Sequence, residues 1–181
     1  MDVLTHSFHT PFGELLLGSF DGWIVLCDWR YRRMRDTVDR RVQRGLEASY
    51  SEGMSPVIEA AMEQLSAYFR GERRTFDVPL RSVGTDFQRR VWEALITIPY
   101  GATETYASLT ARVAEPAAIR AVASANGANA LSILVPCHRI VGSDGELVGY
   151  AGGTSTKRKL LQLEGALLAT AQPDLFSEAA G

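Results

Sequence analysis

The run Ile133–Val141 constrains this chain more than any other segment. It begins with apolar residues, continues through a proline, and places Cys137 directly before His138. A short apolar stretch of this kind predicts a buried strand, which we expect over Ile133–Val135 as a support for the thiol. A thiol is a weak nucleophile until a neighbouring group takes its proton or lowers its pKa, and an adjacent histidine makes either possible.

Taken alone, the dipeptide favours a buried structural cysteine, because cysteine is among the most frequently buried residue types. The chain has only two cysteines, Cys27 and Cys137. Two cysteines in such separate contexts form neither a disulfide framework nor a metal site of the usual spacing, so we expect no metal. The sequence has no signal segment and no apolar run of about 18 residues. We therefore expect a cytoplasmic protein without membrane contact, in a reducing compartment where a free thiol survives.

The composition argues against a strongly basic nucleic-acid binder. The net charge is -2 and 46% of the residues are hydrophobic, whereas the pI of a basic DNA-binding domain usually exceeds about 9. Binding to phosphates would therefore also use backbone N–H groups and helix termini.

The first 83 residues contain strand and helix signals but no cluster of chemistry-bearing residues. Asp21-Gly22 predicts a two-residue hairpin turn between strand-like runs, and Ser55-Pro56 predicts the start of a helix. The arginine-rich stretch Arg30–Arg44 has roughly helical apolar spacing and charges of both signs. This pattern favours a solvated helix face over a nucleic-acid patch.

The second half reads as a set of short helices. Thr85 and Gln88 fit a capping box, and Thr105 is expected to cap a helix that continues to Val113. After a turn, a helix of mostly small residues is expected over Ala117–Ala125. Two short helices joined by a tight turn outline a helix-turn-helix, although close packing against another helix explains the small residues equally well.

Several motifs occur in one order between Gly84 and Gly165. They are Gly84-Thr85-Asp86-Phe87-Gln88-Arg89-Arg90-Val91-Trp92, Ile98-Pro99-Tyr100-Gly101, Tyr106, Arg120-Ala121-Val122, Asn126-Gly127-Ala128-Asn129, Pro136-Cys137-His138-Arg139, Gly149-Tyr150-Ala151-Gly152-Gly153 and Leu160-Leu161-Gln162-Leu163-Glu164-Gly165. In this order they resemble the O6-alkylguanine-DNA alkyltransferases, the methylated-DNA–protein-cysteine methyltransferases, in their stand-alone bacterial form. The preceding residues resemble the family only in general layout.

The resemblance implies an α+β fold. Residues 1–83 would form a small α/β domain, with a β-meander plus helices in a ribonuclease H-like arrangement. Residues 84–165 would form a mainly helical, winged helix-turn-helix-like domain for DNA binding and alkyl transfer. Residues 166–181 would be a flexible tail.

The resemblance also implies a direct-reversal DNA repair reaction without a cofactor. Cys137 would take the alkyl group from O6-alkylguanine as a thiolate, His138 would accept the thiol proton through a water, and Glu164 would orient His138. Tyr106 would donate a hydrogen bond or proton to the guanine N3, and Asn129 would hold the turn before the nucleophile. The thioether product is stable, so each molecule would act once as a methyltransferase.

The DNA-binding roles follow from the same resemblance. Double-stranded DNA would be entered from the minor groove, with the damaged nucleotide flipped out and Arg120 in the vacated place. The remaining predicted contacts are Ala121 on the small-residue helix, Tyr150 and the Ala151 N–H in the base pocket, the Val135 and Cys137 carbonyls on the exocyclic amine, Lys157 beneath the glycine-rich loop, and Gly127, where some members have an arginine. We expect a monomer; acceptance of O4-alkylthymine and cooperative binding along DNA stay open.

Three other functions fit the residues less well. Non-catalytic binders of alkyl lesions in the family lack the cysteine that this chain has at Cys137. A helix-turn-helix regulator would need several long polar side chains on its reading helix, where Arg120 stands nearly alone. A Cys-His hydrolase would turn over repeatedly and would need an oxyanion hole, for which the sequence offers no clear residues.

Overall fold

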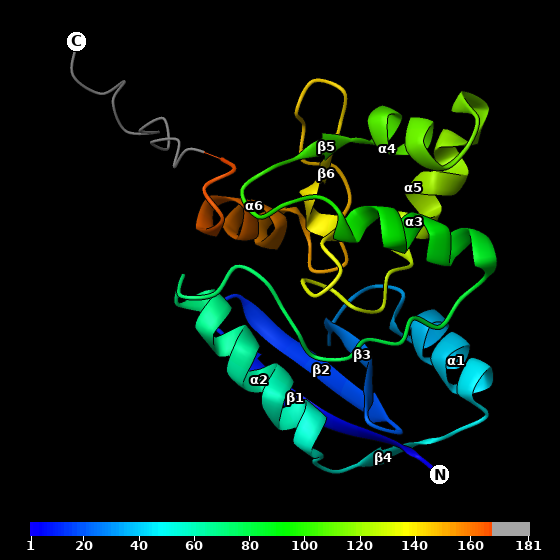
Figure 1. Cartoon of the computed structure of the whole chain (residues 1–181), viewed down its shortest axis with the longest axis vertical. Coiled ribbons are helices and arrows are strands. Elements are labelled where there is room, and N and C mark those ends of the chain that lie inside the picture. The colour runs from blue at the N-terminus through cyan, green and yellow to red at the C-terminus, as the bar shows by residue number, and fades with distance from the viewer. Residues whose placement is uncertain (168–181) are drawn as a thin grey trace.

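The computed structural model describes residues 1–167 and has an α+β fold (Figure 1). The N-terminal half consists of β1 (Val3–Thr10), β2 (Gly13–Phe20), β3 (Trp23–Trp29), α1 (Arg35–Leu46), β4 (Tyr50–Glu52) and α2 (Pro56–Phe69). The C-terminal half consists of α3 (Asp86–Ile96), β5 (Glu104–Thr105), α4 (Tyr106–Val113), α5 (Ile119–Gly127), β6 (Ile140–Val141) and α6 (Thr154–Leu163), with single 3-10 turns at Pro116–Ala118 and Cys137–Arg139.

The N-terminal half is built on a sheet with the strand order β3-β2-β1-β4. The first three strands form an antiparallel meander, and β4 pairs in parallel with β1. The hairpin turn predicted at Asp21-Gly22 is confirmed, and both residues have the positive φ angles that such a turn requires.

Two helices cover opposite faces of this sheet, because neighbouring strand residues point to opposite sides. On one face α2 packs in the same apolar cluster as Leu15, Leu17 and Ile24. On the other, α1 packs with Val25 and Leu26. The start of α2 is as predicted: Pro56 is its first residue and the Ser55 side chain accepts a hydrogen bond from a backbone N–H of the first turn.

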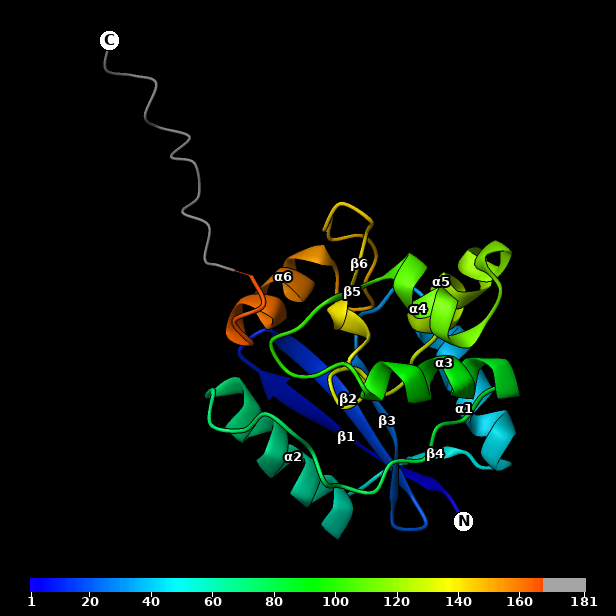
Figure 2. The ribbon, with the colours of Figure 1, turned by 45° about the horizontal axis from the view of Figure 1, so that its top comes forward.

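The C-terminal helices gather on one side of the sheet, near the end of β3 (Figures 1 and 2). The capping box of Thr85 and Gln88 is present at the start of α3. Thr105 caps α4, and α5 follows after a short turn. The second helix differs from its predicted bounds, since Pro116 opens a 3-10 turn and regular α-helix covers Ile119–Gly127.

The strand predicted over Ile133–Val135 is wrong. Ile133 has a φ angle of 71°, in the left-handed region that residues with a Cβ rarely adopt. The Leu134 N–H donates to Ser132 and the Val135 N–H to Leu131, at 2.9 and 2.8 Å. The N–H groups of Leu134 and Val135 are therefore satisfied within the segment's own tight turn and not along a neighbouring strand.

One apolar cluster extends through both halves. Leu17 and Ile24 of the sheet share it with Leu131, Val135 and Leu160 of the C-terminal half. The backbone also crosses, since the Cys27 N–H donates to the Ala130 carbonyl at 2.8 Å. Among the described residues, no helix is long and apolar enough to cross a membrane. From residue 168 on, the predicted tail lies outside the described residues.

Candidate active site

Cys137 opens the 3-10 turn that follows the tight turn, and only 4% of its surface is exposed. The Asn129 side-chain amide donates to the Cys137 Sγ at 3.2 Å and to the Val135 carbonyl at 2.9 Å. Its oxygen accepts from the Leu131 N–H at 3.0 Å. Burial raises the pKa of the Cys137 thiol, and the Asn129 hydrogen bond opposes this by favouring the thiolate.

His138 is fully buried, with its Nε2 2.8 Å from the Glu164 carboxylate. The same carboxylate accepts from the Tyr68 hydroxyl at 2.7 Å and from two nitrogens of the Arg139 guanidinium, each at 2.9 Å. Four donors on one buried carboxylate fix its position. His138 in turn has a single defined ring orientation towards Glu164.

The charges of this network are set by its contacts. Burial by itself raises the pKa of Glu164, but hydrogen bonds from His138 and Arg139 outweigh it and lower the pKa to about 2. Burial lowers the pKa of His138. At neutral pH the network therefore holds an ionised carboxylate beside a neutral imidazole, which is able to accept a proton. Within residues 1–167, the His138 Nδ1 has no hydrogen-bond partner.

A cavity of about 230 Å³ adjoins Cys137. Five separate parts of the chain meet around it: the segment before α1, the start of α4, the helix α5, the turn of Cys137 and the glycine-rich loop. The lining residues are Arg32, Arg33, Met34, Tyr106, Ala123, Asn126, Gly127, Cys137, Gly149, Tyr150 and Ala151.

Two tyrosines give the cavity neutral hydroxyl groups. The Tyr106 hydroxyl donates to the Val148 carbonyl at 3.4 Å, and the Tyr150 hydroxyl accepts from the Trp29 indole at 2.9 Å. Burial raises the pKa of both tyrosines. Both therefore keep their protons at neutral pH. The Tyr150 hydroxyl can donate its proton to a bound ligand, and Tyr106 can do so by exchanging its long bond to Val148 for one to the ligand.

Lys157 lies beneath the loop on α6 and is fully buried. Its ammonium donates to the carbonyls of Val148 and Gly149 at 3.1 and 3.3 Å. Burial lowers its pKa to about 8. The amine is therefore mostly protonated at neutral pH and ties α6 to the chain that leads into the cavity.

The other predicted site residues lie at different distances from the thiol. Arg120 and Ala121 are exposed on α5, outside the cavity lining, whereas Gly127 and Ala151 belong to that lining. Val135 is fully buried outside it, and its carbonyl accepts from both Asn129 and the Cys137 N–H.

Sequence reasoning missed part of the site. Tyr68 and Arg139 complete the network on Glu164; Arg139 stands next to the predicted pair, but no local pattern points to Tyr68. The expectation of a solvated helix over Arg30–Arg44 is wrong at its start. The helix α1 begins only at Arg35, and Arg32 is buried because the Asp28 carboxylate and carbonyls of the other half surround it.

The arrangement combines a thiol and neutral hydroxyl donors around one cavity with a buried proton acceptor, His138, at the residue after the thiol. Such a set can perform nucleophilic displacement on a ligand held in that cavity. Within residues 1–167 there is no cluster of His, Cys, Asp and Glu side chains that could hold a metal ion.

Comparisons with known proteins agree on one family. A family model described as "6-O-methylguanine DNA methyltransferase, DNA binding domain" matches residues 86–166. A methylated-DNA–protein-cysteine methyltransferase of Mycobacterium bovis is 55% identical over 104 residues, which are 58% of this chain and 63% of that protein. A protein of the same name from Methanosarcina acetivorans is 51% identical over 159 residues, 87% of this chain and 96% of that one.

Solved structures extend the likeness to the fold of both halves. The crystal structure of Mycobacterium tuberculosis OGT in complex with DNA matches with a TM-score of 0.77 and 38% identity, over 91% of this chain and 94% of that one. The crystal structure of the O6-methylguanine methyltransferase of the same organism matches over 96% of this chain and 97% of its own, with a TM-score of 0.74 and 38% identity. The chain therefore belongs to the methylated-DNA–protein-cysteine methyltransferase family.

Proposed function

We propose that this protein repairs DNA by direct reversal: it moves the alkyl group of O6-alkylguanine to Cys137, once per molecule. The observation that carries the proposal is the buried thiol of Cys137 at the wall of a cavity, with the Asn129 amide bonded to its sulfur and the His138–Glu164 pair beginning at the next residue. Family membership gives the substrate class.

The transfer step is an in-line displacement. His138 takes the thiol proton through a water, and the Glu164 carboxylate stabilises the imidazolium that results. The thiolate sulfur forms a bond to the alkyl carbon while the bond from that carbon to the guanine oxygen breaks. The electron pair goes to the guanine, which Tyr106 stabilises by a proton or hydrogen bond at N3. The proton that His138 took from the thiol then returns through solvent, so that the guanine, Tyr106 and His138 all end neutral. The product is a thioether on Cys137 and an unmodified guanine.

The substrate base reaches the thiol only outside the duplex, since the thiol is almost fully buried. Arg120, exposed on α5, takes the vacated place in the stack, and the small exposed side chain of Ala121 lets this helix approach from the minor groove. Tyr150 and Ala151 hold the base, with the Ala151 N–H on the guanine oxygen. Lys157 keeps the loop in place.

Other parts of the proposal concern the setting of the reaction. We infer a monomer that binds double-stranded DNA in the cytoplasm, where a reducing environment keeps Cys137 as a thiol. No metal or cofactor takes part in this step. The boundary at Gly84 separates a supporting half from a DNA-binding and alkyl-transfer half.

The experiment is a mass-shift assay with O6-benzylguanine and with duplex DNA that carries O6-methylguanine. Wild type should gain one benzyl or one methyl group per chain and then stop, and peptide mapping should place it on Cys137. Cys137→Ala should gain none, while Cys27→Ala, the control for the other thiol, should gain as much as wild type. An unmodified wild-type protein under reducing conditions would disprove the proposal, and continued release of product would favour a hydrolase.

A further inference from the structure

Two arginines of the N-terminal half hold the turn that leaves α5. Arg32 donates to the Gly127 carbonyl at 2.6 Å and to the Asn129 carbonyl at 3.1 Å. Arg41 donates to the carbonyl between them, that of Ala128, at 2.5 Å. Three consecutive carbonyls of this turn are thus bound by guanidinium groups from a different part of the fold.

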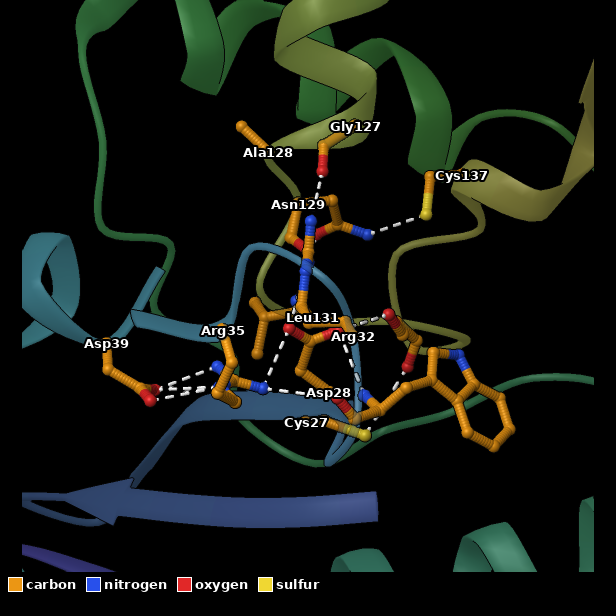
Figure 3. Close-up of polar contacts among 12 residues, drawn as sticks. Cys27, Asp28, Arg32, Arg35, Asp39, Gly127, Ala128, Asn129, Leu131 and Cys137 are labelled. Carbon is orange, nitrogen blue, oxygen red and sulfur yellow. Dashed lines mark hydrogen bonds and ion pairs between the residues drawn. The ribbon is translucent and has the colours of Figure 1, made fainter. Parts of the chain in front are cut away.

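Arg32 is fixed from the other side by Asp28, at the end of β3 (Figure 3). The two side chains form an ion pair of 2.9 Å, with 6% of the arginine side chain and none of the aspartate exposed. The Asp28 carboxylate also accepts from the Ser132 hydroxyl at 3.0 Å and from Arg35 at 3.0 Å. Asp28 therefore bonds to Arg32 and to the tight turn that precedes the nucleophile.

The chain of contacts ends at the reacting atom. Arg32 binds the main-chain carbonyl of Asn129, and the side chain of the same Asn129 donates to the Cys137 sulfur at 3.2 Å. Figure 3 shows these contacts as a continuous series that begins at Asp28 of the sheet and ends at Cys137. Arg32 also lines the cavity.

We propose that Arg32, held by Asp28, is a positioning residue for alkyl transfer: it fixes the Asn129 turn so that the Asn129 amide stays on the Cys137 sulfur. This inference rests on the proposed function. The N-terminal half thereby takes part in the reaction through a residue whose side-chain hydrogen bonds within residues 1–167 go to Asp28 and to the turn after α5, and not to the sulfur.

The physical reason is that the end of a helix carries carbonyls without partners and a partial negative charge. A guanidinium offers several N–H donors in a rigid fork, so that Arg32 can join two carbonyls and a carboxylate at once. A lysine has the same charge without this fork. A displacement of the Asn129 amide by a fraction of its hydrogen-bond length weakens its support of the thiolate.

Arg35 provides a matched control. It also binds the Asp28 carboxylate, at 3.0 Å, and 15% of its side chain is exposed. Its other partners are Asp39 and the Trp29 carbonyl, and none of its hydrogen bonds within residues 1–167 reaches the turn after α5. Arg32→Met and Arg35→Met therefore each remove one contact with Asp28, but only the first frees the Asn129 turn.

The experiment follows the pH dependence of the alkylation rate of Cys137 by free O6-benzylguanine, per active molecule as titrated by end-point labelling. The titratable and charged groups around the thiol and its proton acceptor are the same in all variants apart from the position changed. They are His138, Glu164, Arg139, Tyr106, Tyr150, Lys157, Asp28, Arg32 and Arg33. We expect Arg32→Met to move the thiol limb of the profile to higher pH and to slow the reaction at pH 7 by about tenfold or more. Arg35→Met should keep the wild-type limb.

Further variants separate geometry from charge. Arg32→Lys keeps the charge but not the fork. Its thiol limb should therefore move to higher pH by most of the amount seen in Arg32→Met. If Arg32→Met does not fold, Arg32→Lys alone tests the inference. In an Asn129→Ser background, Arg32→Met should add no further shift, because the two act through one contact. The inference would be overturned if the thiol limb of both Arg32 variants stayed at its wild-type pH. It would also be overturned if Arg32→Met shifted the limb of Asn129→Ser as much as it shifts that of wild type. Failure of the proposed function itself is distinct, since wild type would then not be labelled.

Discussion

His138 Nε2 lies 2.8 Å from Glu164 Oε1, and both side chains are closed to solvent. The pair is one edge of a larger network, in which Arg139 and Tyr68 bind the same carboxylate. The carboxylate thus serves the histidine and at the same time joins α2 to the end of α6. A change at Glu164 should consequently affect both the reaction and the stability of the fold.

The first prediction concerns acid stability. Because the pKa of Glu164 is lowered to about 2 in the folded protein, its ionisation stabilises the fold above the unfolded-state pKa, and this contribution is lost as the pH falls through about 4.5 towards 2. The full contribution is about 3 kcal/mol. Urea unfolding at pH 7, 5 and 3 should show this loss in wild type and not in Glu164→Gln. The exposed carboxylate Glu93 provides the control: if Glu93→Gln removed the same loss, the assignment to Glu164 would be wrong.

The second prediction separates DNA binding from chemistry. Arg120→Ala should slow transfer from O6-methylguanine in duplex DNA by about tenfold or more and leave the reaction with free O6-benzylguanine unchanged. Because Arg120 is exposed, the free energy of unfolding should change by no more than about 0.5 kcal/mol. Arg44→Ala, which removes an exposed arginine of α1, is the control and should react with both substrates as wild type does. Equal slowing of both substrates in Arg120→Ala would contradict the role of Arg120.

The third prediction concerns Lys157 at alkaline pH. Burial lowers its pKa to about 8 from an ordinary value of 10.5, so the unfolded chain binds more protons than the folded one between these values. Stability should therefore rise with pH in that window, by about 2 kcal/mol between pH 7 and 9.5. Denaturant unfolding at these two pH values should detect the rise in wild type and its loss in Lys157→Met. Lys159→Met, at an exposed position of α6, should behave as wild type; a rise that persists in Lys157→Met would rule out Lys157 as its source.

The fourth prediction tests how tightly the glycine-rich loop is packed. A Cβ added at Gly152 would lie 2.8 Å from the Trp29 indole nitrogen, whose hydrogen bond holds Tyr150 in the cavity wall. Gly152→Ala should lower the free energy of unfolding by about 1–3 kcal/mol and slow benzyl transfer. Gly127→Ala is the matched change, since a Cβ there meets no atom within 4 Å. Thermal unfolding and labelling rates should show Gly152→Ala to be less stable and slower than Gly127→Ala. Equal effects of the two changes would disprove the steric argument.

The sequence predicted those features that depend on neighbouring residues. The capping box of Thr85 and Gln88 and the hairpin turn at Asp21-Gly22 are local, because each is satisfied within a few residues. The order of the motifs from Gly84 onward identified the family. The roles assigned to individual site residues stay predictions.

Other features depend on contacts between distant parts of the chain. Arg32 is buried because acceptors from β3 and from the turn after α5 meet around it, so the charge pattern of its own segment was misleading. The turn at Ile133 was predicted as a strand because an apolar run does not reveal where its backbone finds hydrogen bonds. Tyr68 reaches Glu164 across 96 positions of the sequence, which no local pattern encodes.

The apolar cluster that extends through both halves bears on how members of this family can diverge. The backbones of Cys27 in β3 and Leu131 form an isolated β-bridge, and both side chains belong to that cluster. Since contacting residues do not contribute independently to stability, a mutation accepted in β3 alters which mutations the turn before Cys137 can accept later. N-terminal halves exchanged between two relatives would therefore bring mismatched partners to this cluster, even where the residues around the nucleophile are identical.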